Sequence, residues 1–209
     1  MILRSSLKKA VVPAKGADIL YKHINNVVSI AKELMMKKVS KGDLVVDATV
    51  GNGHDTLLLA QLVGQEGRVY GFDIQEYAIN NTSQKIIENN LTERVYLIKD
   101  SHENIDQYIT EKVDLVIFNL GYLPGGDHDI VTRAETTLIA IEKSLHLLKE
   151  NGLLLVTTYI GHKEGKTEDK YIKKYLSDLS QKQFNVLKFE FVNQINYPPI
   201  LFCVEKNKL

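Results

Sequence analysis

The chain has 209 residues, 44% apolar and 25% charged, a balance typical of a soluble globular domain with a single core. No apolar run approaches the roughly 20 residues of a membrane span, and the first residues lack the apolar region of a signal peptide. We therefore expect a cytoplasmic protein without membrane contact. The lone cysteine, Cys203, excludes a disulfide framework, a cysteine-ligated zinc ion and a three-cysteine iron–sulfur cluster.

Positive and negative charges cancel over the chain but are unevenly distributed along it. Residues 1–41 carry nine Lys or Arg against two acids, residues 42–160 carry eight against eighteen, and residues 161–188 carry seven against four. Basic flanks around an acidic centre suit a polyanion held at the edges of a site that binds a cation, although solvated helix faces give the same pattern. We expect a basic extension over residues 1–17 and one catalytic domain over residues 18–209.

The spacing of apolar residues predicts helices and strands in alternation. An amphipathic stripe over residues 18–39 indicates the first helix. Strands are predicted over 43–48, 67–73, 94–98, 113–119 and 152–159, and further helices over 54–63, 75–90, 102–109, 131–149 and 167–180. This order is typical of right-handed βαβ units in a parallel sheet with both faces covered.

The last two apolar runs, 184–192 and 200–204, have no helical pattern between them and predict a closing antiparallel pair. By analogy of element order, we expect the Rossmann-like α/β fold of class I methyltransferases. That fold is a seven-stranded, mostly parallel sheet with a C-terminal antiparallel β-hairpin and helices on both faces.

Residues 44–56 form the most informative motif, a buried strand that leads into a glycine turn behind an acidic residue. Gly51 and Gly53 can adopt a positive φ, and the following helix directs N–H groups at a ligand. Thr56 replaces the third glycine of a dinucleotide fingerprint, and Asp47 would repel a pyrophosphate. A cationic cofactor suits this carboxylate better. We therefore predict S-adenosyl-L-methionine (SAM), a sulfonium with an amino-acid tail, although a purely structural turn shares the pattern.

Polar residues also follow the next two predicted strands, where an open parallel sheet binds its ligands. Asp73 and Gln75 follow the second strand, at about the distance from Asp47 at which an acidic residue meets ribose hydroxyls. Ser101 and His102 follow the third strand, in a position to bond an adenine edge. Helix N-capping is the alternative for Asp73 and Ser101.

The fourth predicted strand ends in Asn-Leu-Gly-Tyr, residues 119–122, which is similar to the (Asp/Asn)-Pro-Pro-Tyr motif of amino-group methyltransferases. There, the Asn oxygen and a backbone carbonyl accept hydrogen bonds from the amine, and the aromatic ring packs on the substrate. We predict catalytic roles for Asn119 and Tyr122, and proton acceptance by Asp127 or His128. A plain turn, a core tyrosine and a loop-capping histidine are the alternatives. The histidines match no metal-ligand spacing, so we predict no metal.

Four segments, 47–56, 100–104, 118–128 and 161–166, resemble the YtqB/MnmM family. The resemblance implies a SAM-dependent tRNA methyltransferase that converts 5-aminomethyl-(2-thio)uridine at the wobble position to its methylaminomethyl form, with the tRNA anticodon stem-loop as partner. A homodimer is left open. The predicted cofactor contacts are Asp47, Gly51, Asn52, Gly53, Asp55, Asp73, Gln75, Ser101, His102 and Asn119. The candidates for phosphate contact are Lys8, Lys9, Lys15, Lys163, Lys166, Lys170, Lys173 and Lys174.

Three other interpretations remain open. A methyltransferase of the same fold could act on rRNA or on a small amine. A nicotinamide-dependent oxidoreductase is disfavoured by Asp47 and Thr56. A non-catalytic RNA-binding module would bind tRNA without turnover. In the tRNA methyltransferase, Tyr122 or Tyr159 could stack on the extruded wobble base.

Overall fold

The computed structural model of the protein describes residues 24–121 and 132–208. Its helices are α1 (Val27–Lys38), α2 (His54–Val63), α3 (Glu76–Glu88), the 3-10 turn η1 (His102–Asn104), α4 (Ile105–Tyr108), α5 (Ala134–Leu147) and α6 (Lys163–Ser177). Its strands are β1 (Leu44–Asp47), β2 (Arg68–Asp73), β3 (Val95–Lys99), β4 (Val113–Asn119), β5 (Leu148–Thr158), β6 (Phe184–Phe189) and β7 (Ile200–Lys206).

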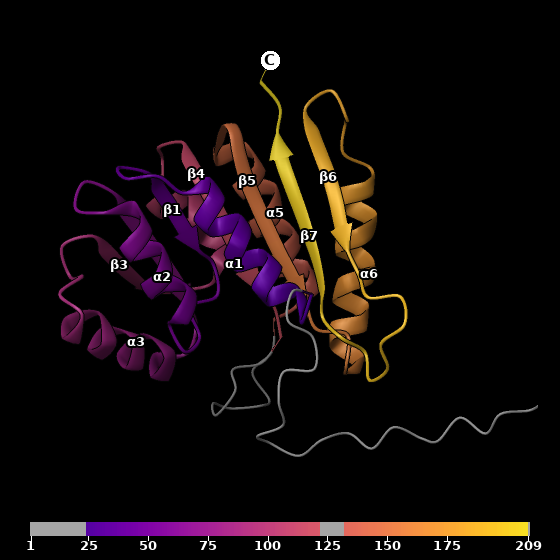
Figure 1. Ribbon diagram of the computed structural model, residues 1–209, viewed down its shortest axis with the longest axis horizontal. Coiled ribbons are helices and arrows are strands. Elements are labelled where there is room, and N and C mark those ends of the chain that lie inside the picture. Colours follow the sequence, from indigo (N-terminus) through magenta and orange to yellow (C-terminus); the bar gives the residue numbers. More distant parts are fainter. Residues whose placement is uncertain (1–23, 122–131, 209) are drawn as a thin grey trace, which may run out of the picture.

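Within the described residues, the strands form one seven-stranded sheet in the order β3-β2-β1-β4-β5-β7-β6 (Figure 1). The first five strands in this order run parallel, while β7 is antiparallel to both β5 and β6. Strands β2 and β3 lie on one side of β1, whereas β4 and β5 lie on its other side, so the order of strands reverses between β1 and β4. Ligands bind outside the strand ends at such a switch point. The predicted α/β fold with a C-terminal antiparallel hairpin is confirmed.

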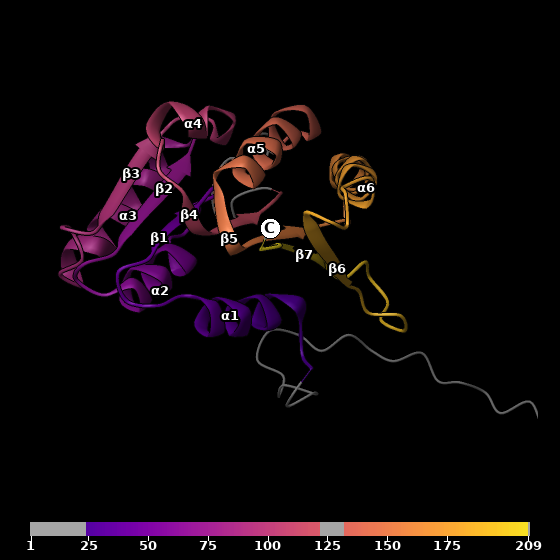
Figure 2. The ribbon, with the colours of Figure 1, turned by 90° about the horizontal axis from the view of Figure 1, so that it is seen from above.

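Helices cover both faces of the sheet (Figure 2). Helices α1, α2 and α3 lie on one face, and α4, α5 and α6 lie on the other. Each helical layer has its own buried apolar cluster against the sheet, with Met35 and Leu59 in one and Ile141 and Ile172 in the other. The two clusters explain why the central strands are apolar on both faces, since neither side of the sheet meets water.

The burial of each strand follows from its place in the sheet. All four residues of β1 are buried, as are the first six residues of β4. The edge strand β6, in contrast, alternates between partly buried and exposed residues along its first four positions. These continuous and alternating patterns distinguish buried parallel strands from the half-exposed hairpin.

Several predicted helix bounds were wrong. Helix α1 begins at Val27, where Asn26 caps it, instead of at residue 18, and α5 ends at Leu147 because β5 begins at Leu148.

Helix α6 begins at Lys163, four residues before the predicted start, because His162 caps it by accepting a hydrogen bond from the N–H of Gly165 at 3.1 Å. Gly165 is buried, and a Cβ there would collide with the backbone oxygen of Tyr159, so this glycine permits close packing inside the helix. The predicted helix 102–109 consists of a 3-10 turn followed by the single turn α4.

The predicted basic extension, residues 1–17, lies outside the described residues, and the single catalytic domain over 18–209 stays a prediction. Among the residues that the structure describes, no helix is long and apolar enough to cross a membrane.

Two glycines with a positive φ, one in the turn between β1 and α2 and one before β1, give a prediction about stability. Gly53 has a φ of 75°, and a Cβ built on it would lie 2.5 Å from Oγ1 of Thr82 in α3. Gly42 has a φ of 88°, with nothing within 4 Å of its Cβ position. We expect Gly42→Ala to lower the free energy of unfolding by about 1–2 kcal/mol through backbone strain alone.

Gly53→Ala should have a similar backbone strain and, in addition, a steric clash that costs about 1–3 kcal/mol. Urea unfolding of both variants measures the free energy of unfolding. Equal losses in the two variants would show that the contact with Thr82 does not restrict this position.

Candidate active site at the carboxyl ends of the parallel strands

The turn after β1 is organised by the carboxylate of Asp47. This residue is 1% exposed, and its two oxygens accept hydrogen bonds from the N–H of Thr49 at 3.1 Å and the hydroxyl of Thr56 at 2.6 Å. Gly51, with a φ of 52°, and Gly53 adopt the left-handed conformation that lets the chain turn into α2. Asp47 therefore shapes the loop, and its contact with a cofactor stays a prediction.

Asp73, at the end of β2, holds the same turn from the neighbouring strand. One carboxylate oxygen accepts from the N–H of Gly51 at 2.8 Å, and the other accepts from the N–H of Gln75 at 2.9 Å. Two predicted cofactor contacts, Asp73 and Gly51, are thus brought into direct contact with each other. This bond fixes the carboxylate beside the glycine turn, at the strand end where the sequence predicted a ribose contact.

Helix α3 covers the outer side of the turn. The Lys85 ammonium donates to the backbone oxygen of Asn52 at 2.7 Å, and Thr82 occupies the space that a side chain on Gly53 would need. The glycine at position 53 is therefore required by the packing of α3, in addition to any approach of a ligand.

Three carboxylates give this strand end a negative field. Burial, followed by repulsion from Asp55 and in smaller part from Asp73, raises the pKa of Asp47 to about 7, against the hydrogen bonds from Thr56 and Thr49. Burial also raises the pKa of Asp55 and that of Asp73. Lys32 forms an ion pair with Asp55, with Nζ 4.0 Å from Oδ1.

This donor set fits a ligand that carries positive charge, because an ammonium or sulfonium group would stabilise the carboxylates in their ionised form. A pyrophosphate would meet repulsion instead. SAM therefore fits the residues around the turn. When bound, it supplies an electrophilic methyl group on a sulfonium sulfur.

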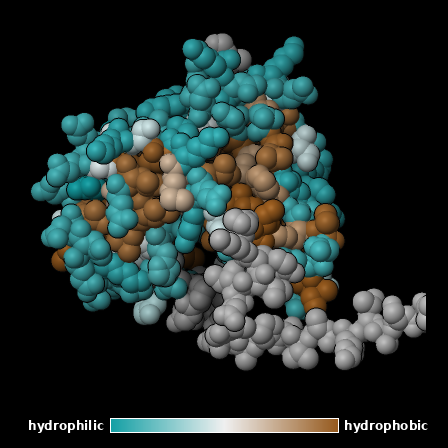
Figure 3. All heavy atoms as spheres, viewed as in Figure 1, coloured by the Kyte–Doolittle hydropathy of each residue, from teal (hydrophilic) through white to brown (hydrophobic). Residues whose placement is uncertain are grey.

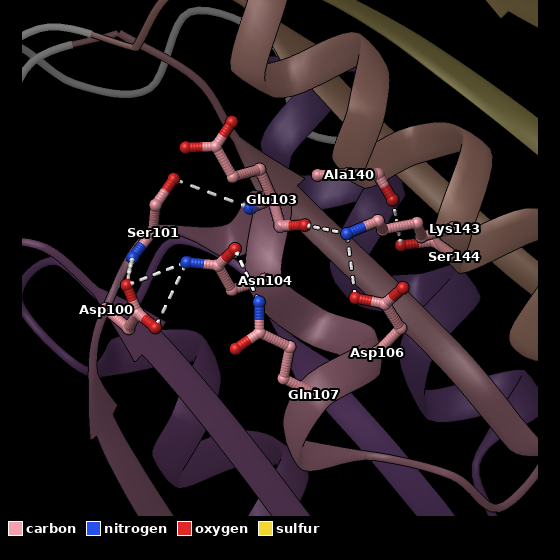
Figure 4. A network of polar contacts seen from close by, with 9 residues as sticks. All are labelled: Asp100, Ser101, Glu103, Asn104, Asp106, Gln107, Ala140, Lys143 and Ser144. Carbon is pink, nitrogen blue, oxygen red and sulfur yellow. Dashed lines mark hydrogen bonds and ion pairs between the residues drawn. The ribbon is translucent and has the colours of Figure 1, made fainter.

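The third strand end forms a local polar network (Figure 4). Asp100 accepts from the N–H of Ser101 at 2.7 Å and from the amide of Asn104, and the Ser101 hydroxyl oxygen accepts from the N–H of Glu103 at 3.5 Å. Ser101 is therefore an N-cap of η1, as the alternative interpretation proposed. It remains partly exposed at the strand end.

His102 points into the protein. The residue is 9% exposed, its ring packs edge-on against Phe118 with centroids 5.5 Å apart, and Nδ1 lies 3.1 Å from the backbone oxygen of Ala48. Because a carbonyl only accepts, Nδ1 donates this bond. Burial lowers the pKa of His102, which favours the neutral ring. The His102 ring thus holds the backbone at Ala48, directly after Asp47. This buried position does not favour contact with an adenine edge.

Asn119 at the end of β4 joins the cofactor turn. Its backbone N–H donates to the hydroxyl oxygen of Thr49 at 2.7 Å, and its side-chain amide donates to Oδ2 of Asp55 at 2.6 Å. Because a carboxylate only accepts, the amide nitrogen must face Asp55 and the amide oxygen must face away from it. The structure thus brings together two predicted site residues that lie 64 positions apart.

The chain after Asn119 is anchored to α6. Gly121 and Thr132 exchange hydrogen bonds, of 2.9 Å from the Gly121 N–H to the Thr132 hydroxyl and 3.1 Å from the Thr132 N–H to the Gly121 oxygen. The Thr132 hydroxyl also donates to Glu168 at 2.8 Å, and this carboxylate is 2% exposed. The ring of Tyr159 lies 3.8 Å from the Cβ position of Gly121. The remaining predicted catalytic residues, Tyr122, Asp127 and His128, lie outside the described residues.

Three residues that shape the site were absent from the sequence-based prediction. Lys32 forms an ion pair with Asp55, and Thr49 accepts a hydrogen bond from the Asn119 backbone. No local sequence pattern marks either residue. Ile74 is 53% exposed, directly after Asp73. An exposed apolar side chain at this strand end offers a surface for a flat ring. The position of Ile74 between the predicted contacts Asp73 and Gln75 could have indicated it from the sequence.

Comparison with known proteins identifies the family of the chain. Residues 69–205 match the family model described as "Putative rRNA methylase". The chain belongs to this family. Its relative from Arabidopsis thaliana, a chloroplastic tRNA (mnm(5)s(2)U34)-methyltransferase, is 35% identical over 187 residues, or 85% of this chain and 68% of the relative.

Solved structures agree with this assignment. A "putative rRNA-methylase" from Clostridium thermocellum is 49% identical, with a TM-score of 0.87 over 88% of this chain and 100% of that chain. A "putative methyltransferase" from Streptococcus mutans, solved in complex with SAH, is 37% identical, with a TM-score of 0.79 over 86% of this chain and 97% of that chain. The predicted family resemblance, the class I methyltransferase fold and SAM as cofactor are confirmed. Among the described residues of this family member, no group of three or more His, Cys, Asp or Glu could hold a metal ion.

The raised pKa of Asp47 predicts a pH-dependent stability. In the folded protein the pKa is about 7, against 3.8 as the ordinary value, so the folded state retains a proton that the unfolded state has lost. Stability should therefore fall as the pH rises from about 4 to about 7. Asp47→Asn should stabilise the cofactor-free protein at about pH 8 by as much as about 4 kcal/mol, and hardly at all at about pH 4.

Urea unfolding at the two pH values measures this difference. Asp178→Asn, which removes an exposed carboxylate directly after α6, is the control and should change stability little at either pH. An Asp47→Asn variant no more stable than wild type at high pH would contradict the assignment.

Proposed function

We propose that this protein transfers a methyl group from SAM to the primary amine of 5-aminomethyl-(2-thio)uridine at the wobble position of tRNA. The acceptor site would be formed by Asn119, with Tyr122 beyond it in the sequence. The proposed partner is the tRNA anticodon stem-loop.

The bond between Asn119 and Asp55 is the observation that carries this proposal. A primary amine must direct its lone pair at the methyl group, so its N–H groups need acceptors on the opposite side. Asp55 holds the amide nitrogen of Asn119 at 2.6 Å, which leaves the amide oxygen as the group presented to a substrate. An acceptor in a fixed orientation at the end of β4 suits an amine better than a hydroxyl or a ring carbon.

The protein must also offset the protonation of its substrate. An alkyl amine with a pKa of about 10 is neutral in roughly one molecule in a thousand near pH 7, which costs about 4 kcal/mol. The positive charge of the bound cofactor would lower that pKa, and Asn119 would orient the neutral amine by accepting its N–H. Asp55 is a positioning residue, because its side chain is only 13% exposed. The proton acceptor stays a prediction for Asp127 or His128.

The relatives support RNA as the substrate. The Arabidopsis thaliana relative is named for methylation at the tRNA wobble uridine, while the family description names rRNA. Methylation of rRNA is therefore the second candidate. On α6, Lys163, Lys166, Lys170 and Lys173 are exposed, and basic side chains on one helix suit a phosphate backbone. Lys8, Lys9 and Lys15 lie outside the described residues.

Nucleoside analysis separates the two RNA candidates. The protein is incubated with SAM and with tRNA or ribosomes from cells that lack this activity. We expect mass spectrometry to show loss of the aminomethyl wobble uridine and gain of the methylaminomethyl form, with no new methylation of rRNA. Methylation of rRNA alone would replace our proposal with the second candidate.

The positioning of Asn119 gives a second prediction. Asn119→Ala should lower kcat/KM for tRNA about a hundredfold or more, because the amine loses its orienting acceptor. Asp55→Asn should lower kcat about tenfold or more, since a second amide can face Asn119 with either its oxygen or its nitrogen.

Calorimetry of SAM binding is the control for both variants. Because Asp55 and Asn119 are also predicted cofactor contacts, turnover of each variant is measured at a SAM concentration that calorimetry shows to be saturating. Wild-type kcat in Asp55→Asn would exclude the proposed role of Asp55, and wild-type kcat/KM in Asn119→Ala would exclude the role of Asn119.

A further inference from the structure

A cavity of about 610 Å³ lies beside the candidate acceptor site, between the start of α6 and the connection from β6 to β7. Its lining includes Ile160 and Gly161 on one side and Ile195, Asn196 and Tyr197 on the other. Ile160 directly follows Tyr159, whose ring lies next to Gly121. The cavity therefore opens within a few residues of the acceptor site, and its volume is in the range of small-molecule sites.

The connection from β6 to β7 presents an unusually exposed aromatic and apolar surface. Tyr197 is 59% exposed, Ile195 is 71% exposed and Val192 is 97% exposed. Figure 3 shows apolar surface at the lower right of the molecule, where Figure 1 places this connection. The exposed apolar side chains are gathered on one connection, and an exposed apolar patch of this kind marks an interaction surface.

The backbone that carries Tyr197 is strained. Asn196 and Tyr197 have φ values of 68° and 53°, so two consecutive non-glycine residues adopt the left-handed conformation. Each such residue costs about 1–2 kcal/mol, and for a bulky side chain the conformation is a genuine outlier. Strain of this kind is concentrated at ligand sites, where it fixes the position of a functional side chain.

A basic side chain lies against the aromatic residue of the cavity. The Lys166 ammonium lies 4.0 Å from the centroid of the Tyr197 ring, and Lys163 is exposed one turn earlier on α6. Glu190, an acidic residue of the lining, is paired with Lys188 at 2.6 Å. The aromatic residue of the lining, Tyr197, is thus in contact with a basic group, and an aromatic face and a basic group are the two features that bind single-stranded nucleic acid.

We infer that this cavity binds a nucleotide of the RNA substrate that neighbours the methylated one, with its base stacked on Tyr197 and its phosphate near Lys166. This inference rests on the proposed function, because it takes RNA as the substrate. It also assigns the strained connection from β6 to β7 a role in holding the RNA while the adjacent nucleotide reaches Asn119.

The test is the affinity of an anticodon stem-loop RNA for the intact protein, measured by fluorescence anisotropy. Tyr197→Ala should raise Kd about fivefold to a hundredfold, because stacking on one base is lost. Tyr197→Phe retains the ring and should bind like wild type. Tyr96→Ala, at a 44% exposed tyrosine on β3, is the matched control and should also bind like wild type.

Lys166→Ala provides a second variant at an exposed position, where loss of folding is not expected. It should weaken binding and reduce the slope of log Kd against log salt by about one phosphate contact. In turnover with tRNA, Tyr197→Ala should raise KM and leave kcat at saturating tRNA unchanged.

Wild-type Kd in both Tyr197→Ala and Lys166→Ala would overturn the inference. A fall in kcat with unchanged Kd would also overturn it, because Tyr197 would then act on the methylated nucleotide itself. These outcomes are separable from failure of the proposed function, since wild-type protein that binds the stem-loop without methylating wobble uridine would refute only the reaction. Wild-type protein that binds no RNA would overturn both.

Discussion

The site depends on three carboxylates collected around one glycine turn. Asp47 is held by the turn that it shapes, Asp73 bonds the N–H of Gly51 from the next strand, and Asp55 opens α2 beside them. Burial opposes ionisation of all three carboxyl groups, and mutual repulsion opposes it further at Asp47. A cation bound at the turn relieves this repulsion, whereas a phosphate would add to it. The same carboxylates therefore organise the turn and favour a positively charged ligand.

Asp55 links this negative turn to the acceptor site. Its carboxylate contributes to the field that raises the pKa of Asp47, and the same carboxylate orients the amide of Asn119. After β4, Thr132 and the buried carboxylate of Glu168 anchor Gly121 to α6. The proposed amine site is thus built by elements from both faces of the sheet. The switch point between β1 and β4 brings these elements together.

Much of this arrangement could be predicted from sequence, because local patterns encode it. Buried apolar runs predicted the parallel strands, and the bounds predicted for α2 and β4 are those in the structure. The early start of α6 was missed, since Gly165 weakens a helical pattern and its close packing becomes visible only in three dimensions. The burial of His102 and the bond from Asn119 to Asp55 depend on contacts between distant segments, which one sequence does not reveal. Tyr122 and its neighbours stay sequence-based predictions.

The proton balance of cofactor binding tests the role of the carboxylates most directly. SAM is titrated into the protein by calorimetry at about pH 6, in two buffers with different heats of ionisation. Because the pKa of Asp47 is about 7 in the free protein, a cationic ligand should displace its proton, and we expect release of close to one proton per site. Asp47→Asn should abolish most of that release. Binding without proton release, or with proton uptake, would contradict the claim that a cationic ligand ionises the buried carboxyl group of Asp47.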